Sequence, residues 1–136
     1  MRRNPVTSFG ITYTEPLAQQ WQAFVQGPCI SCEAAYGLSE THTMDTGMPF
    51  DAIRWGTQGK PMPGVSIRIV DPDSGTERAP GDMGEITVHS PGNFKGYWNK
   101  PEATAATLKS GWVWTGDMGK KDGDGYLSFI GRTKEM

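Results

Sequence analysis

The feature that most constrains the fold of this chain is the stretch from Gly111 to Lys134, which predicts two β-strands joined by a tight reversal. Its two ends are rich in aromatic and aliphatic residues, whereas residues 121–125 are Lys, Asp and Gly. Aspartate and glycine tolerate the backbone angles that a reversal needs. Such a hairpin brings Asp117 toward the same end of the sheet as Arg132. An acidic and a basic group beside glycines suit a sugar phosphate, although a surface ion pair is the commoner meaning of this spacing.

The segment before this hairpin continues the β pattern. Residues 65–70 alternate apolar and polar side chains, and residues 84–89 do the same after two turn clusters. Residues 101–108 begin with proline and predict a short helix. We therefore expect a small antiparallel sheet or distorted β-barrel over residues 59–132. The Gly- and Pro-rich passage at 59–64 is the clearest boundary before it.

The chain upstream of this boundary predicts a helix that begins near Thr14 and ends at Gly27. Leu17, Trp21 and Phe24 recur at helical spacing and form one apolar face. The most economical role for this face is packing on a sheet, so we expect these three side chains in the core.

The segments on either side of this helix differ in character. Residues 1–9 carry no periodic signal and are expected to form a frayed or linking end. Residues 29–35 predict a strand. A helix followed by a strand reads as the end of an α/β subdomain over residues 1–58, so the predicted fold class is α+β.

The loop after this strand carries the chemistry-bearing residues, because ligands of open α/β sheets bind beyond the carboxyl ends of strands. The Tyr36 ring can stack on a base, and Gly37 permits close approach of the backbone. The hydroxyls of Ser39 and Thr41 can hydrogen-bond phosphate oxygens. The Glu40 carboxylate can hold magnesium, which prefers oxygen ligands.

The two cysteines, Cys29 and Cys32, form a C-x-x-C pattern. A thioredoxin-like pair belongs at the start of a helix, and a zinc site needs two further ligands. His42 and His89 are the only histidines, and neither has clear metal-ligand spacing. We therefore expect two buried or half-buried thiols on a strand.

Charge and hydropathy exclude several classes of partner. The chain of 136 residues has 13 basic and 15 acidic side chains without a block of like charge, so no nucleic-acid partner is expected. No apolar run approaches the length of a transmembrane segment, and no signal-peptide core follows Met1. We expect a cytoplasmic protein.

Four sequence blocks together resemble the adenylate-forming enzymes, a family that includes acyl-CoA synthetases, luciferases and peptide-synthetase adenylation domains. The blocks occur in the family's order over roughly residues 10–136. They are Tyr36-Gly37-Leu38-Ser39-Glu40-Thr41, Gly84-Glu85-Ile86, Gly96-Tyr97-Trp98 with Pro101-Glu102 and Thr104, and Trp114-Thr115-Gly116-Asp117 followed by Gly125-Tyr126-Leu127 and Gly131-Arg132.

The resemblance implies roles for individual residues. Tyr36 would line the adenine site, Ser39 would contact phosphate and Glu40 would help to place magnesium, which makes Ser39 and Glu40 the expected catalytic residues. Asp117 would accept hydrogen bonds from the ribose hydroxyls. Arg132 would contact the ribose or phosphate region. Serine stands at position 39 where threonine is more common, and the hydroxyl is retained.

The resemblance also implies a reaction. A carboxylic acid and ATP form an acyl-adenylate with release of pyrophosphate, and the thiol of coenzyme A then displaces AMP. Lys134 falls at the hinge about which a C-terminal domain swings, so residues 133–136 would begin that hinge. The family's phosphate loop and C-terminal catalytic lysine are missing. We therefore expect a middle segment of a larger enzyme that is inactive alone.

Within this family we favour an acyl-CoA synthetase for a fatty or related apolar acid, and Met44 and Met48 are candidates to line the acyl channel or to fill core space. An adenylation domain that serves a carrier protein is an alternative. A non-catalytic β-rich binding or oligomerisation module is a second alternative. Apolar surface without neighbours could also drive self-association.

Overall fold

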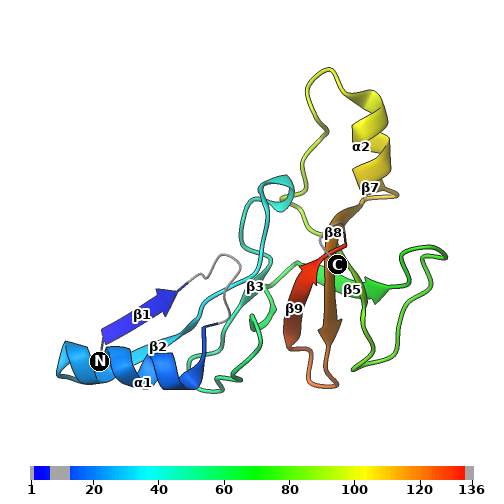
Figure 1. Cartoon of the computed structure of the whole chain (residues 1–136). Coiled ribbons are helices and arrows are strands. Elements are labelled where there is room, and N and C mark those ends of the chain that lie inside the picture. The colour runs from blue at the N-terminus through cyan, green and yellow to red at the C-terminus, as the bar shows by residue number, and fades with distance from the viewer. Residues whose placement is uncertain (1, 7–12, 134–136) are drawn as a thin grey trace.

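The computed structural model describes residues 2–6 and 13–133. Figure 1 shows a helix beside two strands in the N-terminal part and a curled sheet in the C-terminal part. The elements in chain order are β1 (Arg2–Val6), α1 (Glu15–Val25), β2 (Cys29–Glu33), the single 3₁₀ turn η1 (Ser39–Thr41), β3 (Thr46–Gly47), β4 (Lys60–Pro61), β5 (Ser66–Val70), β6 (Gly84–His89), α2 (Pro101–Thr107), β7 (Leu108–Lys109), β8 (Trp112–Lys121) and β9 (Leu127–Arg132).

The first strand corrects the expectation of a structureless N-terminal end. β1 pairs in parallel with β2, in a register that joins Arg2 to Cys29 and Val6 to Glu33. Its pairing partner lies 27 residues further along the chain, beyond the reach of a local periodic pattern. The prediction for residue 1 and residues 7–9 lies outside the described residues.

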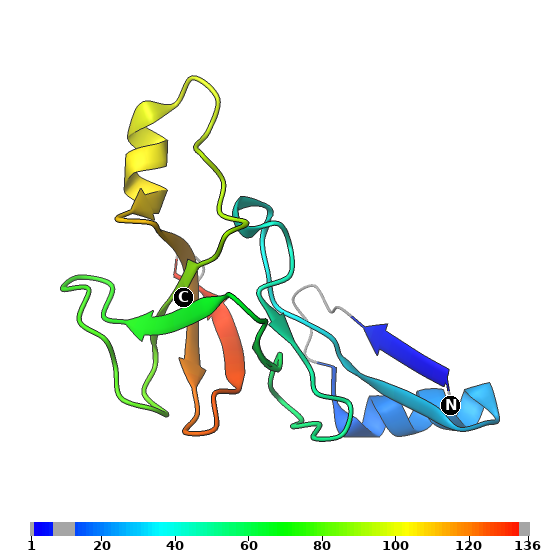
Figure 2. The same cartoon turned by 180° about the vertical axis from the view of Figure 1, so that it is seen from behind.

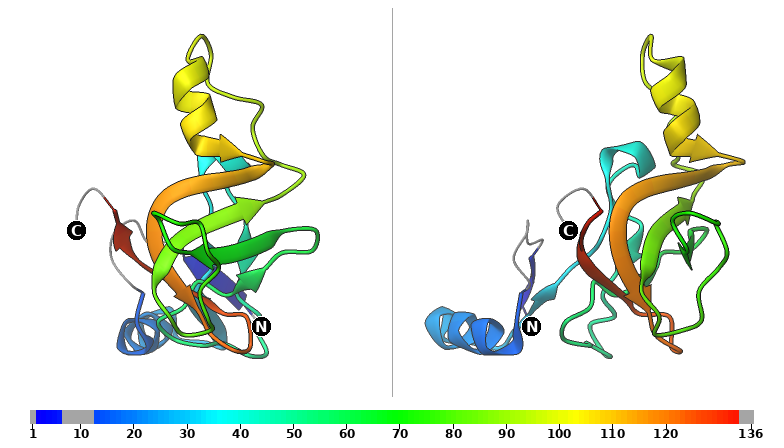
Figure 3. Two further views of the ribbon diagram at one scale, coloured as in Figure 1. Left: turned by 90° about the vertical axis from the view of Figure 1, so that its right-hand side faces the viewer. Right: turned by 45° about the vertical axis from the view of Figure 1, so that its right-hand side comes forward.

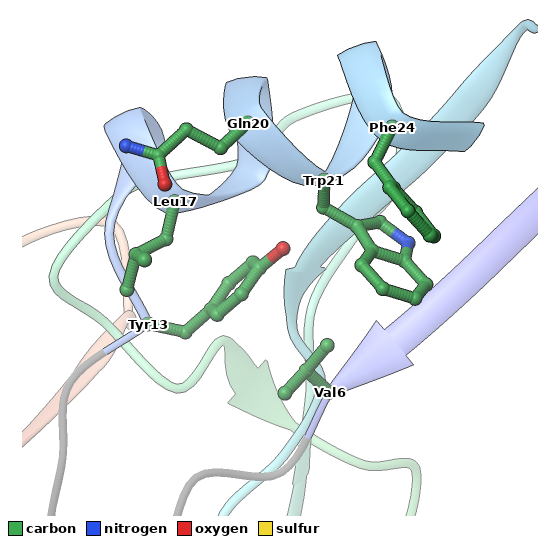
Figure 4. A pocket seen from close by; sticks show the side chains of 6 residues that line it. All are labelled: Val6, Tyr13, Leu17, Gln20, Trp21 and Phe24. Carbon is green, nitrogen blue, oxygen red and sulfur yellow. The ribbon is translucent and has the colours of Figure 1, made fainter. Parts of the chain in front are cut away.

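The helix α1 has the predicted ends, because Thr14 is extended with Pro16 in the first turn, and Gln26 takes a left-handed conformation before Gly27. Its apolar face is not in the core, which contradicts the prediction. Leu17 and Trp21 are each 43% exposed and Phe24 is 77% exposed. A two-stranded sheet offers too little surface to cover this face. The side chains that line the resulting open pocket in Figure 4 are Val6, Tyr13, Leu17, Gln20, Trp21 and Phe24.

The C-terminal part is the antiparallel sheet that the sequence predicts. The strands lie in the order β5-β6-β8-β7, and β9 pairs with the second half of β8. Figures 2 and 3 show the sheet curling around itself. The register shifts within the β6–β8 and β8–β9 pairs, and such irregularities bend strands and increase their twist.

The curled sheet encloses an apolar cluster. Tyr36 from the N-terminal part belongs to this cluster and so anchors its loop to the sheet. The other members are Ile67, Ile69, Ile86, Val88 and Leu127.

The second cluster joins the two parts of the chain. Cys32 from β2 and Met48 pack with Tyr126, which precedes β9. Both cysteines are buried thiols on β2, as predicted. Met48 is therefore a core residue, whereas Met44 is exposed.

The predicted boundary passage is tied into the structure on both sides. β4 pairs with β3, and the Leu127 amide donates a hydrogen bond to the Gly59 carbonyl. The division of the chain at residue 58 stays a prediction.

The short helix α2, also predicted, projects away from the sheet in Figure 1. Across residues 2–6 and 13–133, no helix has the length and apolarity to cross a bilayer.

Candidate functional site

The site is built where the loop after β2 meets the middle of β8. The Tyr36 hydroxyl donates a hydrogen bond of 2.8 Å to Asp117 Oδ2, and both residues are buried. The Tyr36 ring stacks against Phe129 with centroids 6.3 Å apart. This contact joins the first and last sequence blocks, which are 81 residues apart.

Asp117 also faces Arg132, as the hairpin predicts. The two residues are register partners across β8 and β9, and Arg132 Nε lies 3.4 Å from Asp117 Oδ1. The Asp117 side chain is 9% exposed, whereas the Arg132 side chain is 63% exposed. The pair thus consists of a buried carboxylate and an exposed guanidinium group.

The backbone beside Asp117 is open to solvent. Gly116 has a φ of +72° and no heavy atom within 4 Å of the position that a Cβ would take. Its carbonyl accepts hydrogen bonds from the Thr133 amide and hydroxyl, at 2.9 and 3.0 Å. Gly116 itself is exposed, so the main chain next to Asp117 faces solvent.

The electrostatics of the pair fix the direction of its hydrogen bond. Burial raises the pKa of Tyr36, and the nearby charge of Asp117 raises it further. The phenol therefore remains protonated at neutral pH and stays a donor to the carboxylate.

The loop 37–43 owes its shape to contacts within the protein. A Cβ on Gly37 would overlap the main-chain carbonyl of Thr43, so glycine is needed for the loop to close on itself. We expected Gly37 to admit a ligand, and the structure gives this close approach to the protein's own backbone instead. His42 and Thr43 both have positive φ values, 63° and 72°, which few non-glycine residues adopt.

Glu40 connects this loop to the third sequence block. Glu40 Oε1 accepts a hydrogen bond of 2.7 Å from the Tyr97 hydroxyl, and the Phe94 amide donates to the Glu40 carbonyl at 2.7 Å. Burial raises the pKa of Tyr97, and the hydrogen bond to Glu40 adds to the effect. Glu40 is half-buried.

The two predicted hydroxyls of η1 differ in burial. Ser39 is exposed. Thr41 is buried, and its hydroxyl donates to Asp45 Oδ2 at 2.5 Å. In this arrangement the Thr41 hydroxyl serves the loop and does not reach solvent, which differs from the predicted phosphate contact. Lys134, the predicted hinge residue, lies outside the described residues.

A family model described as AMP-binding enzyme matches residues 6–98, more than half of the chain. The chain belongs to the AMP-binding enzyme family.

Individual relatives agree with this assignment. Indoleacetate–CoA ligase of Aromatoleum aromaticum is 48% identical over 103 residues, which are 74% of this chain and 20% of the relative. Long-chain-fatty-acid–CoA ligase of Yersinia pestis is 34% identical over 128 residues, 93% of this chain and 22% of the relative. ATP-bound MatB of Rhodopseudomonas palustris has a TM-score of 0.80 at 35% identity, covering 98% of this chain and 25% of that one. The chain thus spans about a fifth of the length of these curated relatives.

The polar residues at the site have the chemistry that a nucleotide requires. A buried carboxylate beside an open glycine suits the hydroxyls of a ribose. Glu40 offers one carboxylate oxygen, and the described residues contain no cluster of three or more His, Cys, Asp or Glu that could hold an ion. Magnesium is commonly held by one or two carboxylates together with phosphates and water.

The sequence did not single out three residues that support the site. Tyr97 belongs to the Gly96-Tyr97-Trp98 block, and this block is the sequence signal that could have found it. Asp45 and Thr46 lie in a polar stretch without a pattern that marks them. Thr46 Oγ1 accepts from the Tyr36 amide at 2.7 Å and donates to the Gln58 carbonyl at 2.5 Å.

Proposed function

We propose that this chain is the part of an ATP-dependent carboxylate–CoA ligase that binds adenosine and begins the phosphate site. The observation that carries the proposal is the buried hydrogen bond between Tyr36 and Asp117, because it brings two separate family blocks into one polar cluster. Membership of the AMP-binding enzyme family supports the nucleotide. The whole reaction is inferred from relatives of which the matched region is about a fifth.

The ribose end of the site is Asp117 and Arg132. Asp117 would accept hydrogen bonds from ribose hydroxyls, and the open backbone at Gly116 supports their approach. Arg132, exposed at the rim, would contact the ribose or the phosphates. The Tyr36 ring would border the adenine, and this contact stays a prediction.

The phosphate end is the loop between Gly37 and Thr41. The exposed Ser39 hydroxyl would donate to a phosphate oxygen, and Glu40 would give its Oε2 to magnesium, with Oε1 held by Tyr97. Bound magnesium would neutralise phosphate charge as the substrate carboxylate attacks. Gly37 and Thr41 would act by shaping this loop.

The reaction that these roles serve is formation of an acyl-adenylate, followed by transfer of the acyl group to coenzyme A. We propose a fatty or related apolar acid as substrate and the cytoplasm as the location. Lys134 would be the hinge to a further domain. Because a single set of nucleotide contacts cannot complete the chemistry, we propose that this chain alone does not catalyse adenylation.

Two other functions compete with this one. The non-catalytic module is favoured by the exposed apolar face of α1, which suits self-association. An adenylation domain for a carrier protein would use the same nucleotide contacts and differ only in the acceptor thiol.

Calorimetric titration of the chain with AMP tests the proposal. We expect saturable binding of AMP and weaker binding of ribose 5-phosphate, with no pyrophosphate exchange by the chain alone. Absence of AMP binding by the folded chain would favour the module. A robust exchange rate would contradict the proposed dependence on further parts.

A further inference from the structure

Asp45 is a fully buried carboxylate that none of the proposed ligand contacts uses. It follows the loop that carries Ser39 and Glu40 and directly precedes β3, with an exposed fraction of 0%. Burial of an acidic group is unfavourable unless its oxygens are paired. We therefore examined which groups the Asp45 carboxylate contacts.

The contacts of Asp45 close the base of the loop. Its Oδ2 accepts a hydrogen bond of 2.5 Å from the Thr41 hydroxyl. Its amide donates to the Tyr36 carbonyl at 2.8 Å, and its carbonyl accepts from the Met62 amide at 2.9 Å. Its Oδ1 is buried without a hydrogen bond in the described part of the chain. The carboxylate is therefore directed at one partner, the Thr41 hydroxyl.

The contact between Thr41 and Asp45 spans the strained part of the loop. The three residues between them include His42 and Thr43, both at positive φ. Thr43 is β-branched, and such residues seldom adopt this conformation. Strained backbone persists only where surrounding contacts over-determine it.

Thr41 in turn fixes the turn that presents the proposed ligands. Thr41 ends η1, and its Oγ1 lies 3.4 Å from the Leu38 amide, which donates to it. Ser39 and Glu40 lie between Leu38 and Thr41. The position of both proposed ligands is thus tied to Asp45 through a single hydroxyl.

We propose that Asp45 is a positioning residue that holds Ser39 and Glu40, through Thr41, in place for the phosphates and magnesium of ATP. This inference rests on the proposed nucleotide site. It predicts that loss of Asp45 weakens the interaction with the phosphates and spares the interaction with adenosine, which depends on Tyr36 and Asp117.

The test compares adenosine and Mg·ATP as calorimetric ligands of the full chain. Asp45→Ala and Thr41→Val each remove the same hydrogen bond, while Asp45→Asn keeps an acceptor for the Thr41 hydroxyl. Asp51→Ala is the matched control, because Asp51 is an exposed acid six residues further along. We expect the first two variants to bind Mg·ATP about tenfold more weakly, since a hydrogen bond to a charged group contributes on the order of one such factor.

Adenosine affinity should stay within about twofold of the parent in every variant, and Asp45→Asn should recover most of the Mg·ATP affinity. Amide hydrogen exchange over residues 38–43 should quicken in Asp45→Ala and Thr41→Val and not in Asp51→Ala. Equal Mg·ATP binding by parent and Asp45→Ala would overturn the inference, as would a parallel loss of adenosine. If the parent binds neither ligand, the proposed function fails and this inference fails with it.

Discussion

The Tyr36 hydroxyl and the Asp117 carboxylate form a buried hydrogen bond of 2.8 Å across 81 residues of sequence. Tyr36 lies in the loop after a parallel strand pair, whereas Asp117 lies in the middle of the longest antiparallel strand. One hydrogen bond therefore links the two architectures of the chain at the proposed nucleotide site.

Replacing Tyr36 by Phe should destabilise the chain. The change removes a donor from a buried charged acceptor, which costs about 2 kcal/mol, whereas loss of a hydrogen bond to a neutral acceptor costs about 1 kcal/mol. Urea denaturation of Tyr36→Phe and of Tyr126→Phe provides the comparison, because the Tyr126 hydroxyl donates to the neutral Ala52 carbonyl. Equal losses in the two variants would count against a special role for the charged pair.

Replacing Asp117 by Ala should weaken the binding of AMP by at least about tenfold, because each hydrogen bond to a carboxylate contributes about 1.5–3 kcal/mol. Asp117→Asn keeps the shape of the side chain and guards against misfolding of the alanine variant. Asp124→Ala is the control, since Asp124 is an exposed acid that pairs with Arg54. Superimposable titration curves for all three variants and the parent would remove Asp117 from the site.

The stability of the chain should carry a pH signature from Asp45. Burial raises the pKa of Asp45 from 3.8 to about 6. Between these values the folded state binds more protons than the unfolded state, so this group's contribution to the free energy of unfolding falls as the pH rises. The fall is at most about 3 kcal/mol.

Chemical denaturation of the parent and of Asp45→Asn at pH 4 and pH 7 measures this contribution as a difference. The variant should gain stability relative to the parent on going from pH 4 to pH 7. The comparison with the parent is needed because the pKa values of Asp71 and Asp122 are lowered, and these groups contribute with the opposite sign. A difference between parent and variant that does not change with pH would contradict the assignment.

Replacing Gly37 by Ala should cost about 1–3 kcal/mol, because the new Cβ overlaps the Thr43 carbonyl. Gly27→Ala is the matched control, since its Cβ position has no heavy atom within 4 Å. The shift in urea midpoint should be large for position 37 and small for position 27. The reverse order would show that the loop does not close as described.

The sequence predicted the features that depend on local pattern. The hairpin places Asp117 opposite Arg132, and the alternation in residues 65–70 and 84–89 gives the strands β5 and β6. Turn residues and a period of two depend only on neighbouring residues, so they can be recognised without knowledge of the rest of the chain.

The features that the sequence missed depend on distant partners. β1 exists because β2 pairs with it, and no local signal marks that partner. Phe24 has the periodicity of a core residue yet is 77% exposed, because periodicity gives the face of a helix and not what covers it. Asp45 reads as a polar loop residue, and only the folded loop shows that it is buried beneath Thr41.

The most direct test of the proposed nucleotide site is a two-dimensional amide NMR spectrum of the chain, recorded with and without an acyl-adenylate analogue. We predict shifts centred on residues 36–41 and 115–117, together with Arg132, and little change in α1. A well-dispersed spectrum that stays the same at saturating analogue would contradict the central claim that Tyr36 and Asp117 form a nucleotide site.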